Sequence, residues 1–410
     1  MTYIERAITP ILMKRVQESK CALVTGARQV GKSTLIKHVF PGYNRASFDD
    51  RLTRLQAKEE PKLFFMNHPC PLFIDEVQKE NSVLEEIKLC VDESEERGNF
   101  ILSGSQKLEL MKGMSESLAG RASITELTGL SLREIHQVKF NRHFIPTDDY
   151  LKEREKEIKP YDNLWETIHK GSYPELYDVE RDWQEYYSSY VSTYLERDIH
   201  ELISADSITF TKFLTAVAAR TGEMLNYANI AGEVGVSEPT IKSWISILER
   251  TGIVFLLQPY SASALNRAIK TPKIYFRDTG LACYLTRWLT PDTLKYSAVA
   301  GNMFETFVVS EILKSYSNEG KDYRFNIFYY RGKDKTVSGE NEIDLIIEEN
   351  GVLYPIEIKM TGNPKANMGA ANPILDKIKE KNRGMGVILC LIDKKTYLRE
   401  NLVALPIEYV

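Results

Sequence analysis

A glycine-rich turn near the N-terminus constrains the fold of this chain more than any other feature. Residues 26–34 read Gly-Ala-Arg-Gln-Val-Gly-Lys-Ser-Thr, between the apolar run Ala22–Val24 and a helical pattern over residues 35–40. The backbone N–H groups of such a turn can surround a phosphate, and the following helix adds its positive dipole. The order of strand, glycine turn and helix therefore predicts a phosphate-binding loop in a parallel sheet.

The residue types in this loop predict separate roles. Lys32 can reach the β- and γ-phosphates of a nucleoside triphosphate, and Ser33 can coordinate Mg²⁺. Arg28, inside the loop, is a candidate arginine sensor, although a surface salt bridge would explain it nearly as well. The residues expected to bind the nucleotide are Gly26, Ala27, Arg28, Gln29, Val30, Gly31, Lys32, Ser33 and Thr34.

A second apolar strand, Leu72–Asp75, is followed by another acid, Glu76. Asp75 can hold a metal through water, and Glu76 is placed to orient an attacking water. The alternative is a glycine turn and two unrelated surface acids. Because both motifs occur in order after apolar strands, we expect this chain to bind a nucleoside triphosphate with a metal and to hydrolyse it.

A third buried strand, Phe100–Ser103, ends in small polar residues. This strand end is expected to face the γ-phosphate, so Ser105 could sense it, or it could simply cap the next helix. Arg121 is a candidate arginine sensor or finger, in the same chain or in a neighbouring one. A surface salt bridge would explain Arg121 nearly as well.

The pattern along the chain predicts an α/β multidomain protein. A parallel sheet is expected within residues 1–150, a helical lid or linker over 151–204, a winged-helix unit over 205–290 and a second α/β domain over 295–410. The charged run 152–157 indicates a solvated helix face or linker. Strands are expected near residues 21–25, 44–48, 71–75, 99–103, 123–128, 325–331, 343–348, 352–359 and 386–392, and helices over 304–316 and near 373–382.

Composition narrows the possible classes of protein. The formal net charge of −4 gives no global attraction to nucleic acid or to an anionic membrane, so a DNA role would need a local basic patch. The five cysteines are scattered without a CxxC pair, which favours reduced thiols in a cytoplasmic protein. No apolar run approaches membrane-spanning length.

The segment 229–250 predicts a helix-turn-helix. Gly235 marks the turn, Ser237 is the expected N-cap and Pro239 lies in the first turn of the next helix. This unit is not basic, which weighs against strong contact with DNA phosphates. Four basic residues follow, and they could form a wing that touches a nucleic-acid backbone or could pack against a neighbouring domain: Arg267, Lys270, Lys273 and Arg277.

A hairpin near the C-terminus aligns several charged residues. Asn350-Gly351 is a strong signal for a two-residue turn. Such a turn places Asp344 directly opposite Glu357, and Glu342 opposite Lys359, all on one face. Pro355 is a caution, because proline inside a strand implies an edge position or a bulge.

This hairpin predicts a metal site. Two carboxylates about 5 Å apart at Cβ repel each other unless a cation lies between them, and a hard divalent metal suits Asp344 and Glu357. Lys359 could position a water or stabilise negative charge on a phosphate. Glu305, on the preceding helix, could complete the metal shell. The alternative is a hairpin with a solvated polar face.

In this order the motifs resemble a prokaryotic family of AAA-type P-loop ATPases. The family combines an ATPase core, a winged helix and a C-terminal domain of unknown function similar to the PD-(D/E)xK nuclease core of restriction endonucleases. The resemblance covers nearly the whole chain and implies ATP binding. It is carried by residues 25–34, 73–78, 102–105, 118–121, 194–199, 273–281, 301–305 and 356–359.

Two hypotheses follow. In the first, ATP and Mg²⁺ support an ATPase whose nucleotide state gates a DNA-directed, metal-dependent nuclease domain. In the second, the chain is a regulatory ATP switch whose nuclease-like domain is a non-catalytic interaction surface. DNA, a second copy of the chain and another protein are open as partners, and no membrane is expected. A small-molecule kinase would leave most of the chain without a role.

Overall fold

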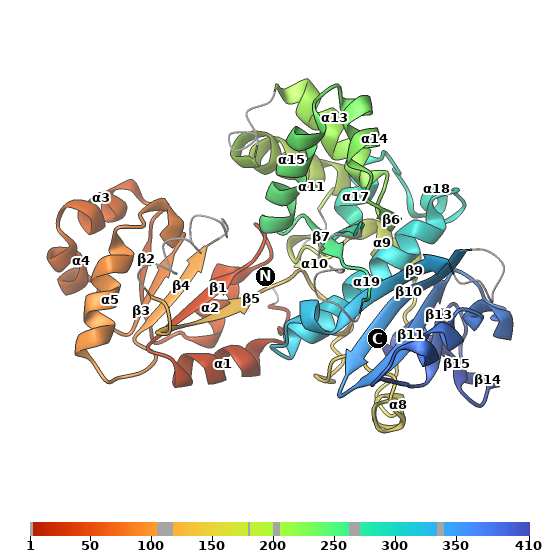
Figure 1. The fold of residues 1–410 in the computed structure, drawn as a ribbon. Coiled ribbons are helices and arrows are strands. Elements are labelled where there is room, and N and C mark those ends of the chain that lie inside the picture. Colours follow the sequence, from red (N-terminus) through yellow and green to blue (C-terminus); the bar gives the residue numbers. More distant parts are fainter. Residues whose placement is uncertain (1–2, 105–117, 179–180, 200–205, 262–270, 334–339) are drawn as a thin grey trace.

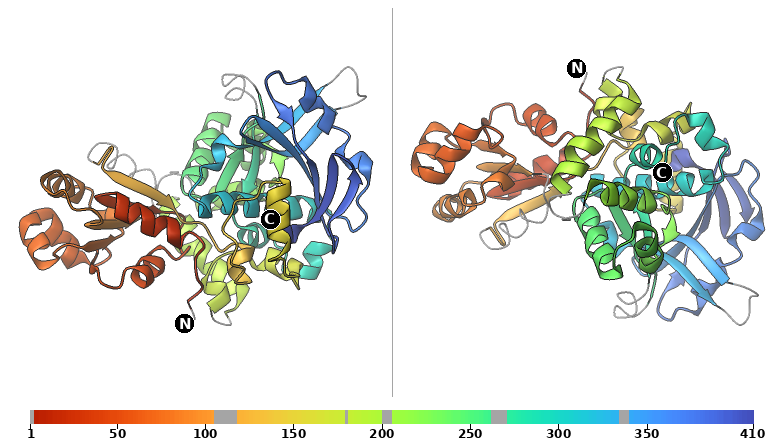
Figure 2. Two further views of the ribbon diagram at one scale, coloured as in Figure 1. Left: turned by 90° about the horizontal axis from the view of Figure 1, so that it is seen from below. Right: turned by 90° about the horizontal axis from the view of Figure 1, so that it is seen from above.

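The computed structural model describes residues 3–104, 118–178, 181–199, 206–261, 271–333 and 340–410. An N-terminal lobe stands beside a larger body that contains the rest of the chain (Figure 1). Two further views show the same division into lobe and body (Figure 2). No helix of these residues is long and apolar enough to cross a bilayer.

The N-terminal lobe is a parallel sheet, as predicted. Its five strands lie in the order β2-β3-β4-β1-β5, which was not predicted. Its strands begin and end within a few residues of the predicted positions. The elements are α1 (Thr9–Glu18), β1 (Cys21–Thr25), α2 (Lys32–Val39), β2 (Asn44–Ser47), α3 (Arg51–Glu59), α4 (Pro61–Asn67), β3 (Leu72–Asp75), α5 (Val83–Glu93), β4 (Phe100–Gly104) and β5 (Ala122–Glu126).

Helices cover both faces of this sheet, so its central strands β1 and β4 are buried at every position. Along β1, Ala22 and Val24 belong to the hydrophobic cluster that includes α1 and α2. Cys21 and Leu23 belong to the opposite cluster, with α5. Successive side chains of a strand point to opposite faces, which explains this division. All five residues of β1 are buried.

A set of short helices leads from the lobe into the body: α7 (Leu132–Ile135), α8 (Asp148–Glu155), α9 (Leu164–Lys170), α10 (Glu175–Asp178), α11 (Trp183–Tyr190) and a π-helical segment, Val191–Ile199. The prediction of a solvated charged run at 152–157 was wrong for Arg154, which is fully buried. Its guanidinium donates to Glu157 O at 3.0 Å and Glu408 O at 2.6 Å. The cation is buried because backbone carbonyls replace its hydration.

The middle of the chain alternates helices with a small antiparallel sheet ordered β6-β8-β7. Its elements are α13 (Ser207–Ala218), β6 (Glu223–Met224), α14 (Tyr227–Val234), α15 (Glu238–Arg250), β7 (Val254–Leu257) and β8 (Lys273–Phe276). The predicted turn between α14 and α15 is confirmed. Gly235 has φ +85° after α14, and the Ser237 side chain caps α15 by accepting from Thr240 N.

The C-terminal part is a mixed seven-stranded sheet, β14-β15-β13-β11-β10-β9, with β12 paired to β11. The helix predicted near 373–382 was wrong: a 3₁₀ helix spans Asn372–Lys377 and β12 follows. Strands β14 and β15 were not predicted. The elements are α17 (Thr279–Leu285), α18 (Pro291–Lys295), α19 (Ala300–Asn318), β9 (Ile327–Lys333), β10 (Glu340–Glu349), β11 (Val352–Lys359), β12 (Asn382–Arg383), β13 (Gly386–Cys390), β14 (Thr396–Arg399) and β15 (Leu402–Pro406).

Helix α19 lies between the N-terminal lobe and the C-terminal sheet (Figure 1). It is buried along most of its length, including polar residues such as Thr306, Glu311 and Lys314. A helix buried on most sides is typical of the centre of a large protein. The position of α19 allows it to contact both candidate sites described below.

Candidate nucleotide site and carboxylate cluster

The predicted phosphate loop lies between β1 and α2. Gly31, the N-cap of α2, has φ +92°, a backbone conformation that favours glycine. Gly26 has φ +147°, and a Cβ built there would lie 2.1 Å from Leu127 O. The sequence therefore requires glycine at Gly26 because the backbone after β5 passes directly over the loop.

Lys32 points back across the loop. Its Nζ donates to Gly26 O at 3.1 Å and to Ala27 O at 2.8 Å. Burial lowers the pKa of Lys32 to about 8, although the nearby acids Glu76 and Asp75 act in the opposite direction. The ammonium group is therefore desolvated at the place where a phosphate is expected, and an anion there would stabilise its charge.

The other loop residues differ in exposure and contacts. The Arg28 guanidinium lies over the Tyr194 ring, 5.1 Å from its centroid. Val30 is buried and Gln29 is exposed with φ +62°. Ser33 and Thr34, the last predicted nucleotide-binding residues of the loop, lie in the first turn of α2.

The acids predicted from the second motif lie at the same edge of the sheet as the loop. Strand β3 ends at Asp75, whose carboxylate accepts a hydrogen bond from Ser103 Oγ on the neighbouring strand β4. Glu76 follows in the left-handed region, with φ +55°, and accepts from Gln78 Nε2. The edge thus combines Lys32, a hydroxyl and two carboxylates. Ser105 lies outside the described residues.

Arg121 lies at the opposite end of the sheet. In the parallel pairing, Ala122 is opposite Cys21, whereas Thr25, next to the loop, is opposite Glu126. Four residues of strand separate the two ends by roughly 13 Å. Arg121 is bound there to Asp92, with Nη2 3.1 Å from Oδ2. Arg121 is therefore remote from the phosphate loop of its own chain.

Arg6 supports the phosphate loop through buried contacts, and this role of Arg6 was not predicted. Its Nη1 donates to Val30 O at 2.8 Å, and its Nη2 donates to Thr128 O at 2.7 Å. Its Nε is 3.0 Å from Glu134 Oε1, in an ion pair whose side chains are 4% and 1% exposed. No sequence signal could have found this contact, because its partners are 24 to 128 residues away.

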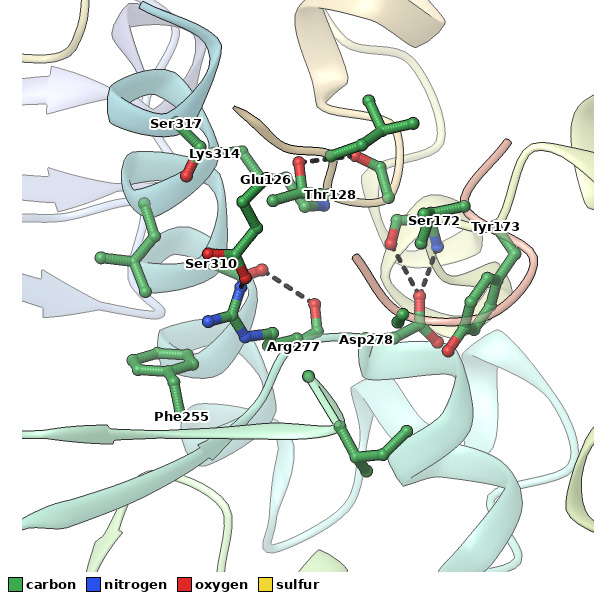
Figure 3. A pocket seen from close by; sticks show the side chains of 17 residues that line it. Glu126, Thr128, Ser172, Tyr173, Phe255, Arg277, Asp278, Ser310, Lys314 and Ser317 are labelled. Carbon is green, nitrogen blue, oxygen red and sulfur yellow. Dashed lines mark hydrogen bonds and ion pairs between the residues drawn. The ribbon is translucent and has the colours of Figure 1, made fainter. Parts of the chain in front are cut away.

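A cavity of about 40 Å³ adjoins the loop, between the lobe and the body. Ala27 and Val30 line it on the loop side, and Arg277 crosses it (Figure 3). Arg277 Nη1 is 3.2 Å from Glu126 Oε1 at the end of β5, and its backbone oxygen accepts from Ser310 Oγ at 2.9 Å. Arg277, the residue after β8, thus connects the five-stranded sheet to α19.

The C-terminal hairpin has the predicted turn. Asn350 and Gly351 both have positive φ, +52° and +78°. The pairs of β10 and β11 run from Glu349 opposite Val352 to Leu345 opposite Ile356. These pairs have the predicted register, and the next pair in it is Asp344 with Glu357.

The caution about Pro355 was wrong, because β11 is a central strand without a bulge against β10. On its other side, β12 pairs with Val352 and Leu353, and β13 pairs from Ile356 onward. Pro355 falls between these two pairings, where its missing N–H breaks no ladder bond. The irregularity lies in β10 against β9, between Ile343 and Ile346.

The predicted acids and lysine meet around Asp344. Lys359 Nζ is 2.7 Å from Asp344 Oδ2 and 2.9 Å from Glu357 Oε2. Glu357 Oε1 is buried without a hydrogen-bond partner among the described residues. Burial, followed by the neighbouring Asp344, raises the pKa of Glu357 to about 8. Lys359 thus bridges the two acids, whose carboxyl groups interact closely with each other.

Two further acids join this cluster through Lys273 of β8. Lys273 Nζ is 2.6 Å from Glu342 Oε1 and 3.2 Å from Glu305 Oε1 on α19. Tyr275 Oη donates to Glu305 Oε1 at 2.6 Å. Glu342 therefore pairs with Lys273, not with Lys359 as its register suggested. We call Glu305, Glu342, Asp344, Glu357, Lys273 and Lys359 the carboxylate cluster.

For Lys273 and Arg277 the sequence left two alternatives, contact with a nucleic-acid backbone or packing against a neighbouring domain. The structure shows the second. Lys273 is buried inside the body, and Arg277 is bound to Glu126. Arg267 and Lys270 lie outside the described residues. Among the residues that are described, no three acid, histidine or cysteine side chains are arranged to hold a metal ion.

Comparison with protein families divides the chain into three matched segments. Residues 18–136 match an AAA domain, and the chain thus contains a P-loop domain of AAA type. Residues 161–292 and 300–410 each match a domain of unknown function. The phosphate loop and Asp75-Glu76 lie in the first segment, and most of the carboxylate cluster lies in the third.

Relatives are similar over most of their length. An uncharacterized protein of Mycobacterium tuberculosis is 26% identical over 375 residues, which is 89% of this chain and 76% of the relative. One of Methanocaldococcus jannaschii is 24% identical over 93% of this chain and 86% of the relative. A Walker-type ATPase structure from Pyrococcus abyssi has 15% identity and a TM-score of 0.44, over 69% of this chain and 96% of that one.

Proposed function

We propose that this chain is an Mg²⁺-dependent ATPase, with its site at the carboxyl edge of the five-stranded sheet. One observation carries the proposal: the phosphate loop, Lys32, Asp75 and Glu76 share that edge. The match of residues 18–136 to an AAA domain supports it. The residues also fit Mg²⁺ and a nucleotide, because a desolvated ammonium faces carboxylate and hydroxyl oxygens.

Each residue has a role in this proposal. The N–H groups of the loop and the Lys32 ammonium bind the phosphates, and the oxygens of Ser33 and Asp75 hold the metal, directly or through water. A bound Mg²⁺ would neutralise charge on the phosphate oxygens. Glu76 orients the attacking water, and Gln78, which donates to Glu76, fixes the direction of that carboxylate. Arg28 and Ser105 remain proposed sensors of the γ-phosphate.

The substitution Glu76→Gln tests the proposal. It keeps the size of the side chain and removes the base, so we expect kcat to fall about 100-fold or more while ATP binding is retained. Lys32→Ala should weaken ATP binding itself. Glu85→Gln, an exposed position on α5, is the matched control. Unchanged ATP turnover in Glu76→Gln would contradict the assignment of Glu76.

Arg121 is proposed to act only on the nucleotide of a second molecule. Because Arg121 is far from the phosphate loop of its own chain, we expect it to reach a phosphate only in a neighbouring molecule. Specific ATPase activity should then rise with protein concentration, and Arg121→Ala should abolish that rise. A specific activity independent of concentration would remove Arg121 from the site.

The carboxylate cluster favours a second function, the binding of a divalent cation by Asp344, Glu357 and Glu305. Its supporting observation is Glu357 Oε1, a buried oxygen with no partner among the described residues. A bound cation would act as a Lewis acid on a phosphodiester. Lys359, bound to both acids, would then stabilise negative charge on the phosphate.

Cleavage of plasmid and linear DNA in Mg²⁺ or Mn²⁺, with and without ATP, tests this second function. Asp344→Asn should abolish cleavage, whereas Asp376→Asn, an acid exposed in the same sheet domain, should not. Loss of cleavage in Lys32→Ala would indicate that ATP gates the nuclease. No cleavage under any condition, with ATP hydrolysis intact, would favour the regulatory switch.

We also propose that the middle unit is a winged helix. The order α13, β6, α14, α15, β7, β8 supports this assignment. DNA remains a proposed partner, but Lys273 and Arg277 are bound to internal carboxylates and contribute nothing to its binding. The domain limits 1–150, 151–204, 205–290 and 295–410 are proposed on the same basis.

A further inference from the structure

A buried lysine from the middle unit reaches into the carboxylate cluster of the C-terminal domain. Lys273, on β8, is 3% exposed. Its strand pairs with β6 and β7, so its backbone belongs to the small antiparallel sheet. Its ammonium nevertheless contacts Glu305 on α19 and Glu342 on β10. Two parts of the chain thus share one charge cluster.

The contacts of β8 determine where Glu305 points. Glu305 Oε1 binds both Lys273 Nζ and Tyr275 Oη. This carboxylate is therefore engaged with β8, although it is near enough to Asp344 for the two acids to interact. Glu305, the third acid of the proposed cation site, is thus bound by Lys273 and Tyr275, whereas Asp344 and Glu357 are bound by Lys359. No three acids of the described residues are arranged to hold a metal in this state.

The cluster contains more acids than cations. The four carboxyl groups of Glu305, Glu342, Asp344 and Glu357 face the two ammonium groups of Lys273 and Lys359. The buried and unpartnered Glu357 Oε1 is a second, independent sign of a cation site, because a buried carboxylate oxygen is normally bound.

We propose that Lys273 is an internal cation that closes the cluster and competes with a divalent metal for Glu305. This inference rests on the proposed cation site. In the closed arrangement, seen here, Lys273 and Tyr275 bind Glu305. In the open arrangement, Lys273 leaves and Glu305 joins Asp344 and Glu357 around the metal.

The same strand offers a route by which the lobe could withdraw Lys273. Side chains alternate along a strand, so Lys273, Tyr275 and Arg277 lie on one face. The first two bind Glu305, and Arg277 binds Glu126 at the end of β5. Movement at the end of β5 would therefore act on the strand that carries Lys273.

Mn²⁺ binding to the 410-residue chain without nucleotide, followed by electron paramagnetic resonance, tests the proposal. Asp344→Asn identifies the signal that belongs to the cluster. Lys273→Met removes the competing charge and should bind Mn²⁺ at this site about tenfold tighter or more than the wild type. Lys273→Arg keeps the charge and should resemble the wild type. Lys381→Met, which breaks a lysine pair with Glu348 elsewhere on β10, is the matched control.

The outcomes separate the two proposals. Asp344-dependent binding that is equal in wild type and Lys273→Met would refute the competition by Lys273 and keep the cation site. Mn²⁺ binding that does not depend on Asp344 in any variant would refute the cation site, and with it the competition by Lys273. Neither result bears on ATP hydrolysis, because Lys32 and Glu76 lie in the other lobe.

A second measurement uses only the wild type, in case Lys273→Met does not fold. Acetylation of lysines by a succinimidyl ester, read by mass spectrometry, reports whether Lys273 is accessible. We expect Lys273 to be protected without metal and modified at saturating Mn²⁺, while Lys381 reacts equally in both. Protection of Lys273 at saturating, Asp344-dependent Mn²⁺ binding would overturn the proposal.

Discussion

Arg6 gives the sharpest prediction about stability, because its contacts are buried and numerous. Arg6→Met keeps the apolar stem but removes the ion pair with Glu134 and the hydrogen bonds to Val30 O and Thr128 O. Breaking a buried ion pair by removing one partner costs roughly 3–5 kcal/mol. Glu134 keeps the donors Ala7 N and Ser131 N. We therefore expect the lower end, a loss of about 3 kcal/mol in the free energy of unfolding.

Urea unfolding can assign this loss to the N-terminal lobe. All four tryptophans lie at or beyond Trp165, so their fluorescence follows the body, whereas far-UV circular dichroism follows both parts. Arg6→Met should shift the transition that circular dichroism detects and fluorescence does not. Arg97→Met, at an exposed arginine bound to Glu18 O, should change stability by less than about 0.5 kcal/mol. A loss below about 1 kcal/mol in Arg6→Met would refute the reasoning.

Two further predictions concern the phosphate loop. The pKa of Lys32 is lowered to about 8 from its ordinary 10.5, so between these pH values the unfolded chain binds more protons than the folded chain. The free energy of unfolding of the wild type therefore rises with pH, and Lys32→Met should lose this rise in urea midpoints measured from about pH 7.5 to 10.5. Midpoints of the two proteins that change in parallel with pH would contradict the prediction. Gly26→Ala places a methyl group 2.1 Å from Leu127 O and should abolish binding of a fluorescent ATP analogue, whereas Gly42→Ala, with nothing within 4 Å, should not.

Features that depend on neighbouring residues were predictable from the sequence. The phosphate loop follows from glycines at positions of positive φ, and the register of β10 and β11 follows from the turn Asn350-Gly351. In both cases a few adjacent residues fix the backbone and thereby place side chains at known offsets. The Asp344 and Glu357 pair was predictable for this reason.

Contacts between distant segments were not predictable. Lys273 begins an aromatic strand and has basic neighbours in the sequence. This pattern is typical of an exposed wing as well as of a buried lysine paired with an acid. Glu305, the partner of Lys273, is 32 residues away and lies on a helix, so no spacing rule connects them. Arg154 was misjudged because the carbonyl that replaces its hydration belongs to Glu408, near the other end of the chain. Tertiary context decides whether a charge faces water or the interior.

Two elements connect the candidate sites. Along α19, Glu305 lies in the carboxylate cluster, and Glu311 Oε2 accepts from Leu132 N at 2.7 Å. Lys314 Nζ, one turn further, donates to Leu130 O at 2.9 Å, in the segment whose residue Leu127 passes over Gly26.

Strand β8 makes the second connection, through Lys273 to the cluster and through Arg277 to β5. Because both elements are buried and packed against each other, a change at the end of β5 cannot be absorbed at the surface. The nucleotide site and the cluster therefore share their supports, and occupation of one is expected to change the affinity of the other by the same factor in both directions.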